Sequence, residues 1–178
     1  KLMSPAYFLV ASVIICSIVS VATGSSWSTI ATVGAAIIGI GNAFNMNPSI
    51  VAGAVISGAY FGDKMSPLSD TTNLASAIAG TDIFTHIRYL LYTTTPTYII
   101  TLIIFGIIGL FYHNTVDITE TDAIITGMES TFHITPWLLL VPVLLAFIII
   151  KKVPPVPAML AGITLGVIFA LIFQPQLI

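Results

Sequence analysis

The stretch that decides the fold lies between apolar runs and reads Gly62-Asp63-Lys64-Met65-Ser66-Pro67-Leu68-Ser69-Asp70-Thr71-Thr72-Asn73. The apolar run before it, residues 49–61, is shorter than the about 20 residues that cross a bilayer. Pro67 prevents a regular helix through the middle. A membrane accepts a broken polar backbone only where the backbone lines a protein cavity or a site. The alternative is a water-exposed turn, for which Asp, Ser, Pro and Gly are equally typical.

The composition favours a membrane protein. Of the 178 residues, 57% are hydrophobic and 7% are charged, whereas a soluble domain carries roughly 25% charged residues. Five basic residues are scattered along a chain of net charge −2, so no patch could follow the phosphates of a nucleic acid. The single cysteine, Cys16, excludes a disulfide within the chain and is interpreted as a small buried hydrophobic residue. We therefore expect the lipid bilayer, and no nucleic acid, as the surroundings.

Further apolar runs predict the other membrane helices. They cover residues 6–22, 30–44, 89–112, 136–150 and 158–173. The expected fold class is all-α, a polytopic transmembrane helical bundle, with residues 1–178 forming one transmembrane region. Pro96 lies inside one of the runs and is expected to kink it. Since the chain begins just before one apolar run and stops in another, we expect a fragment of a longer protein.

Charges in the loops predict the orientation. Arg88 and the pair Lys151-Lys152 lie at the same end of two helices that the acidic loop 113–133 joins. Because basic residues in short loops mark the cytoplasmic side, this loop is expected outside the cell. His113 and His133 bracket the loop with no known metal-ligand spacing, so we interpret it as a solvated external face. Ahead of the run 89–112, Thr81 or Asp82 is expected to cap the start of a helix.

Two carboxylates in the decisive stretch point to ion chemistry. A charged residue at membrane depth costs about 2.5–3.5 kcal/mol on insertion scales and normally faces a cavity or a partner. Here hydroxyls, an amide and the carbonyls freed by Pro67 surround the carboxylates, and such oxygens suit a small hard cation such as Na⁺. A buried carboxyl group also accepts a proton readily. The candidate cation- and proton-binding residues are Asp70, Asp63, Ser66, Ser69, Thr71, Thr72 and Asn73.

Competition between a cation and a proton for one carboxylate is a sufficient mechanism for exchange. Lys64 is a candidate charge partner for either aspartate. A second interrupted segment, residues 23–29, holds five hydroxyl residues in seven, and its Thr23, Ser25 and Ser26 are candidates for a facing wall of the site. The alternative is a kinked or ending helix whose hydroxyls bond back to the preceding turn. Two interrupted segments together are typical of transporters with discontinuous helices.

Both segments resemble a known family. Gly58-Ala59-Tyr60-Phe61 followed by the decisive stretch and Leu74-Ala75 resembles the signature of NhaC-type Na⁺/H⁺ antiporters. Thr23-Gly24-Ser25-Ser26-Trp27-Ser28-Thr29 resembles the upstream motif of that family. The resemblance implies a multi-pass exchanger of cation against proton in the plasma (inner) membrane of a bacterium or archaeon. It also implies a superfamily fold with inverted repeats and with discontinuous or re-entrant helical hairpins that meet at the bilayer midplane.

Carried onto this sequence, the resemblance implies Na⁺ at Asp70 and Asp63. We favour Asp70 as the carboxylate that holds cation and proton, because hydroxyls and an amide surround it, with Asp63 as the second choice. No cofactor is expected beyond the transported Na⁺ and H⁺, and a homodimer is considered as the assembly. Members of the family are longer than this chain, so a complete site is expected to need the missing part.

Three rival functions remain open. An organic-acid antiporter of the malate/lactate type, coupled to Na⁺ and H⁺, would use the same scaffold. An intramembrane aspartyl protease would need Gly-x-Gly-Asp, and Tyr60-Phe61-Gly62-Asp63 lacks the first glycine, so we do not expect an enzyme. A non-transporting membrane subunit would tolerate leucine in place of Asp70.

Overall fold

The computed structural model describes residues 5–112, 135–151 and 153–173, and every regular element within them is a helix. The all-α prediction is confirmed. The chain divides into two compact units, Lys1–Ile118 and Thr119–Ile178. The acidic loop 113–133, both of its bracketing histidines and Lys152 lie outside the described residues.

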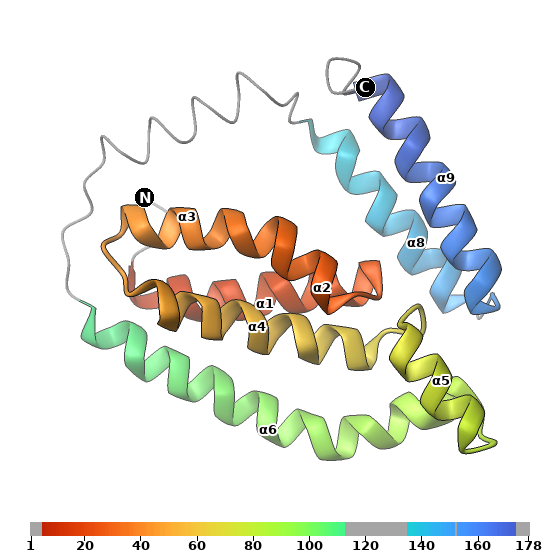
Figure 1. Ribbon diagram of the computed structural model, residues 1–178, viewed down its shortest axis with the longest axis horizontal. Coiled ribbons are helices and arrows are strands. Elements are labelled where there is room, and N and C mark those ends of the chain that lie inside the picture. Colours follow the sequence, from red (N-terminus) through yellow and green to blue (C-terminus); the bar gives the residue numbers. More distant parts are fainter. Residues whose placement is uncertain (1–4, 113–134, 152, 174–178) are drawn as a thin grey trace. The chain divides into compact units, whose positions relative to one another are not determined.

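The first unit begins with a helical hairpin (Figure 1). Helix α1, Pro5–Thr23, ends at Gly24, whose φ of +70° is left-handed and turns the chain. The returning arm is α2, Ser26–Thr29, then the π-helical segment η1, Ile30–Gly34, and α3, Ala35–Ala43. Ser25 caps this arm, since its hydroxyl accepts the Ser28 backbone N–H at 3.3 Å. The interruption predicted over residues 23–29 is therefore confined to Gly24-Ser25.

The prediction that the apolar run 49–61 forms a short helix was wrong, because helix α4 is longer. It spans Pro48–Met65, 18 residues, and so continues through Gly62-Asp63-Lys64-Met65. Asn47 caps it by accepting the Ser49 N–H at 2.9 Å. The expected boundary was wrong because a polar residue in the last turn of a helix does not end the helix. Only residues 66–69 are non-helical, as expected around Pro67.

Two helices follow the break. Ser69 caps α5, Asp70–Ile78, so the second half of the polar stretch begins a helix. Helix α6, Ile83–Phe111, has 29 residues and contains Pro96. Asp82 is its cap, as predicted, and accepts the Thr85 N–H at 3.0 Å. α6 therefore begins six residues before the expected run 89–112, because the cap rather than the first apolar residue sets its start.

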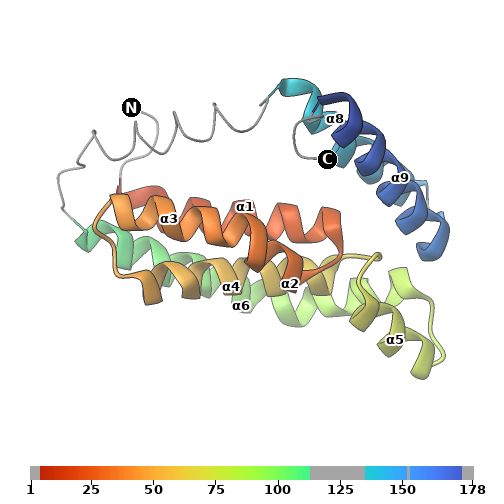
Figure 2. The ribbon, with the colours of Figure 1, turned by 45° about the horizontal axis from the view of Figure 1, so that its top comes forward.

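The first unit is built on α1 and α4, with α6 packed against both, as Figures 1 and 2 show from two directions. Glycines allow the α1–α4 approach: a Cβ on Gly58 would clash with the Val13 carbonyl, and one on Gly62 with the Ser17 carbonyl. The fully buried side chains of this core are Phe8, Leu9, Val13, Cys16, Val51, Ala54, Val55 and Ala59. Small residues at such a contact are typical of membrane helix pairs.

The second unit is a pair of helices. A 3₁₀ turn, η2, Pro136–Leu139, precedes α8, Leu140–Ile150, and α9, Pro155–Phe173, packs against α8. Gly162 leaves room for the Leu145 side chain. The two predicted runs are confirmed as helices, but α9 starts at Pro155, earlier than expected, because proline is favourable in a first helical turn.

Two of the described helices are long and apolar enough to cross a membrane, Ile83–Phe111 and Val156–Phe173. Both expose most of their apolar side chains. On α6 a stripe of isoleucines, Ile99, Ile103 and Ile107, recurs every fourth residue and is about half exposed. In water such a stripe would be unfavourable, whereas lipid solvates it, so these helices fit a membrane protein.

Candidate functional site

The best-defined polar centre is the carboxylate of Asp63, in the last turn of α4. The residue is 8% exposed. Its Oδ2 atom accepts a hydrogen bond of 3.1 Å from the Ser26 hydroxyl, in the first turn of the returning hairpin arm. Its Oδ1 atom is buried and has no hydrogen-bond partner among the residues that the structure describes. A buried polar atom without a hydrogen-bond partner costs free energy. Oδ1 is therefore a position where a proton or a cation would be stabilised.

The tip of the hairpin, residues 21–26, contacts the break after α4, the non-helical residues 66–69. The Ser66 hydroxyl donates to the Val21 carbonyl at 2.8 Å. Gly24 lies directly against the Leu68 backbone, where a Cβ would come within 2.7 Å of the carbonyl carbon. The two interrupted segments of the sequence, about 40 positions apart, therefore form one contact next to Asp63.

Side chains of the following helix hold the broken backbone in place. The Asn73 amide donates to the Pro67 carbonyl at 2.8 Å and to the Ser69 carbonyl at 2.7 Å. The Thr72 hydroxyl lies 3.5 Å from the Asp63 carbonyl and 3.4 Å from the Lys64 carbonyl. The Asp63 carbonyl also accepts the Ser66 backbone N–H at 3.1 Å, so Thr72 adds a side-chain contact to the last turn of α4. These contacts join the first turn of α5 to the last turn of α4, which carries the Asp63 carboxylate.

The other predicted residues lie further from this centre. Asp70 is exposed at the start of α5, and its Oδ1 accepts the Thr71 N–H at 2.8 Å. Ser69 is fully buried, and its hydroxyl lies 2.9 Å from that of Thr71. On the hairpin, the Thr23 hydroxyl lies 3.4 Å from that of Thr29, while Ser25 serves as the helix cap. Of the three facing-wall candidates, Ser26 is the one whose side chain bonds to Asp63.

Serines of the first helix complete the surroundings, and the sequence analysis did not identify them. The Ser20 hydroxyl donates to the Ala59 carbonyl at 2.6 Å. The Ser17 hydroxyl lies 2.9 Å from the Tyr98 hydroxyl, which joins α1 to α6. These two serines recur three positions apart inside an apolar run, and that spacing is the signal that could have identified a polar helix face.

Comparison with known proteins identifies the chain. The family model described as "Na+/H+ antiporter family" matches residues 58–177, which include α4 from Gly58, the break, α5 and α6. The chain belongs to the Na⁺/H⁺ antiporter family. Membership in this family fits the exposed apolar helices, which are those of a membrane protein. No solved structure matches the chain significantly.

The relatives of this family member carry different cargoes. The chain is 45% identical over 174 residues to the Na⁺/H⁺ antiporter NhaC of Alkalihalophilus pseudofirmus, covering 98% of the chain and 37% of the relative. It is 44% identical over 171 residues to the malate-2H⁺/Na⁺-lactate antiporter of Bacillus subtilis, covering 96% and 36%. It is 34% identical over 167 residues to the arginine/ornithine antiporter ArcD of Halobacterium salinarum, covering 92% and 34%. The chain thus spans little more than a third of the length of these curated relatives.

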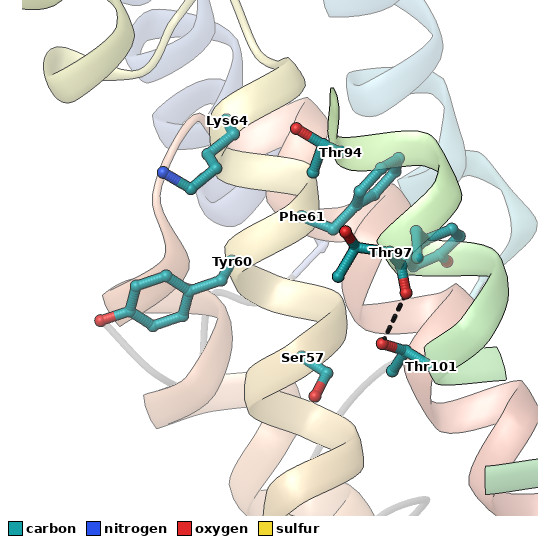
Figure 3. A pocket seen from close by; sticks show the side chains of 8 residues that line it. Ser57, Tyr60, Phe61, Lys64, Thr94, Thr97 and Thr101 are labelled. Atoms are coloured by element: carbon teal, nitrogen blue, oxygen red, sulfur yellow. Dashed lines mark hydrogen bonds between the residues drawn. The ribbon is translucent and has the colours of Figure 1, made fainter. Parts of the chain in front are cut away.

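The predicted charge partner of this antiporter-family site, Lys64, is directed elsewhere. Successive residues on a helix project about 100° apart. Asp63 contacts the hairpin tip, whereas Lys64 lines a groove between α4 and α6 (Figure 3). Across the described parts of the chain, no carboxylate forms an ion pair with its ammonium group. Its pairing with either aspartate stays a prediction.

Proposed function

We propose that the full-length protein is a secondary active transporter that exchanges Na⁺ for H⁺ across the plasma membrane of a bacterium or archaeon. The observation that carries the proposal is the Asp63 carboxylate, buried where the hairpin tip meets the break, with one oxygen lacking a partner among the described residues. Family membership supports the same reaction.

The chemistry follows from a single carboxylate. An ionised Asp63 in a dry site needs a compensating positive charge, which either a bound proton or a bound Na⁺ supplies. The Ser26 hydroxyl oxygen and the carboxylate oxygens are hard ligands that suit Na⁺. One group that holds either ion, but not both well, couples the export of one ion to the uptake of the other.

The helix lengths support a discontinuous membrane-spanning helix. At 1.5 Å per residue, α4 is about 27 Å long and α5 about 13 Å, whereas the antiparallel α6, which packs against both, is about 43 Å long. Residues 66–69 therefore lie beside the interior of α6 rather than beyond its end. A break at that depth is tolerated where it lines a site. We propose a half-site of this kind, completed by an inverted repeat in the rest of the protein.

We propose Asp63, rather than Asp70, as the carboxylate that holds Na⁺ and H⁺. Asp70 is exposed within the described chain and begins a helix, where a negative charge is stabilised. Asp63 is neither exposed nor at the start of a helix, so neither factor stabilises its negative charge. Asp70, Ser66, Ser69, Thr71, Thr72 and Asn73 remain candidate ligands, with Asp70 on the path to the site.

The second candidate is an exchanger of organic acids coupled to Na⁺ and H⁺. The name of the B. subtilis relative favours it. A homodimer stays a proposal for the assembly, and chemical cross-linking in the membrane tests it.

The test is an exchange assay with the full-length protein in vesicles that carry a pH gradient. Added Na⁺ or Li⁺ should dissipate the gradient without any organic acid, and Asp63→Asn should abolish that response. An equal response from Asp63→Asn, or none from the wild type, would contradict the proposal. A response that appears only when malate or lactate is added would assign the second candidate.

A further inference from the structure

Three consecutive residues near the end of α4 contact three different neighbours. Phe61 stacks on Tyr98 of α6, with ring centroids 3.8 Å apart and planes 15° apart, and Figure 3 shows its ring directed from α4 toward α6. Gly62 packs against α1, where a Cβ would clash with the Ser17 carbonyl. Asp63 bonds to the hairpin tip. Because successive residues of a helix project about 100° apart, these contacts together fix the rotation of α4 about its axis.

Tyr98 takes part on both sides of Gly62. Its ring forms the stack with Phe61, and its hydroxyl lies 2.9 Å from the hydroxyl of Ser17. The Ser17 hydroxyl donates its proton to the Val13 carbonyl at 2.7 Å. A serine has one proton to donate, so Tyr98 is the donor in the pair. One side chain of α6 therefore joins the two helices whose packing places the Asp63 turn.

The depth of Tyr98 in the membrane helix supports a specific role. It lies fifteen residues after Ile83, or about 22 Å along a helix about 43 Å long. Tyrosines of membrane helices are enriched at the two interfaces with water, whereas this one lies near the middle. A hydroxyl at that depth needs a partner, and Ser17, which is 5% exposed, provides it.

Binding of a cation is sensitive to the rotation that these contacts fix. A binding site needs its ligands within about 0.5 Å and 10–20° of the productive geometry. A hard cation contacts several oxygens at once, whereas a proton is held by a single carboxylate oxygen. A looser hold on the last turn of α4 should therefore weaken the binding of Na⁺ more than the binding of H⁺.

We propose that Tyr98 is a positioning residue for the Asp63 site, which holds the last turn of α4 against α1 through its bond to Ser17 and its stack on Phe61. It acts through these two helices, because neither its hydroxyl nor its ring bonds to the carboxylate. The inference rests on the exchange at Asp63 proposed above, and it adds a residue of α6 that sets the affinity for Na⁺.

The experiment titrates the proton release that Na⁺ induces in the purified full-length protein. Tyr98→Phe keeps the ring and removes the hydroxyl. The Na⁺ concentration at half-maximal release should rise about threefold to tenfold, while the number of protons released at saturation stays that of the wild type. A loss of folded protein would instead lower that number without moving the midpoint.

Ser17→Ala tests the same bond from α1 and decides the question should Tyr98→Phe not fold. It should shift the midpoint by a similar factor. The double variant should shift it no further, because each single substitution already removes the bond.

Tyr112→Phe is the matched control. The Tyr112 hydroxyl accepts the Asn47 backbone N–H at 3.4 Å, so it also joins the end of α6 to α4. Asn47 lies sixteen residues before Asp63, or about 24 Å along α4. This variant should keep the wild-type midpoint.

The outcomes separate the inference from the function on which it rests. An unchanged midpoint in either single variant, an equal shift in Tyr112→Phe, or additive shifts in the double variant would overturn the role of Tyr98 alone. If Na⁺ releases no protons from the wild type, exchange at Asp63 is overturned, and the inference falls with it.

Discussion

The two oxygens of the Asp63 carboxylate have different surroundings. One accepts the Ser26 hydroxyl and the other has no partner among the described residues. A hydrogen bond to a charged group contributes about 1.5–3 kcal/mol. Ser26→Ala should therefore raise the apparent KM for Na⁺ several-fold or more in the vesicle assay, because the hydroxyl orients the carboxylate and offers an oxygen to the cation.

Ser28→Ala is the matched control for that variant. Ser28 lies in the same short helix and is exposed. Its removal should leave the apparent KM unchanged. Equal effects of the two substitutions would indicate that helix stability, rather than the contact with Asp63, explains the result.

At the scale of single residues, the sequence analysis favoured Asp70 as the ion-binding carboxylate, whereas the proposal made here favours Asp63. Asp63 and Asp70 both lie in a polar stretch, and their chemistry is the same. Their burial differs because α4 continues past Phe61 and carries Asp63 against the hairpin tip, whereas Asp70 begins the next helix. That difference depends on contacts with residues about 40 positions upstream, which local sequence patterns do not contain.

At the scale of elements, the contact between the hairpin tip and the break can be tested through a glycine. Gly24 has a φ of +70° and lies against the Leu68 backbone. Gly24→Ala should destabilise the protein by more than the about 1–2 kcal/mol that left-handed alanine costs, and it should lower Na⁺/H⁺ exchange by displacing Ser26. Thermal unfolding of the purified protein and the vesicle assay measure the two effects.

Gly80→Ala separates backbone strain from the contact. Gly80 has a similar φ of +64°, but a Cβ there would meet open space. The strain of a left-handed alanine is therefore common to both variants. If Gly80→Ala lowers the melting temperature as much as Gly24→Ala does, the tip contact contributes nothing.

The close approach of α1 and α4 predicts a second pair of variants. In Gly62→Ala the new Cβ would meet the Ser17 carbonyl and lie 2.7 Å from the Ser20 Cβ. Overpacking of this kind costs about 1–3 kcal/mol or more, so the melting temperature should fall. Gly53→Ala on the same helix makes an ordinary contact of 3.7 Å with Phe105 and should be neutral or stabilising. A fall in both variants alike would contradict the packing.

Element types were predictable from the sequence, and element ends were less so. The apolar runs indicated the helices because their length and composition are distinctive. The extension of α4 to Met65 and the start of the returning arm at Ser26 were missed. Both depend on capping and on tertiary contacts: Ser25 caps one helix, and Thr72 and Asn73 support the end of the other.

At the scale of the whole molecule, the positive charges predict that the end of α6 near Arg88 is cytoplasmic. In a full-length protein from which every cysteine, Cys16 included, has been removed, Thr81→Cys should react with a membrane-impermeant maleimide in inside-out vesicles and not in intact cells. Ile103→Cys, on the exposed apolar face of α6, should react in neither, because lipid excludes the reagent. Labelling of Thr81→Cys in intact cells would reverse the orientation.

The central claim is that Na⁺ and H⁺ compete for the Asp63 carboxylate. Its most direct test is proton release from the purified full-length protein in a weakly buffered solution when Na⁺ is added. The wild type should release protons as Na⁺ saturates the site, Asp70→Asn should still do so, and Asp63→Asn should release none. Undiminished release from Asp63→Asn, with release lost in Asp70→Asn, would contradict the claim and restore Asp70 as the shared carboxylate.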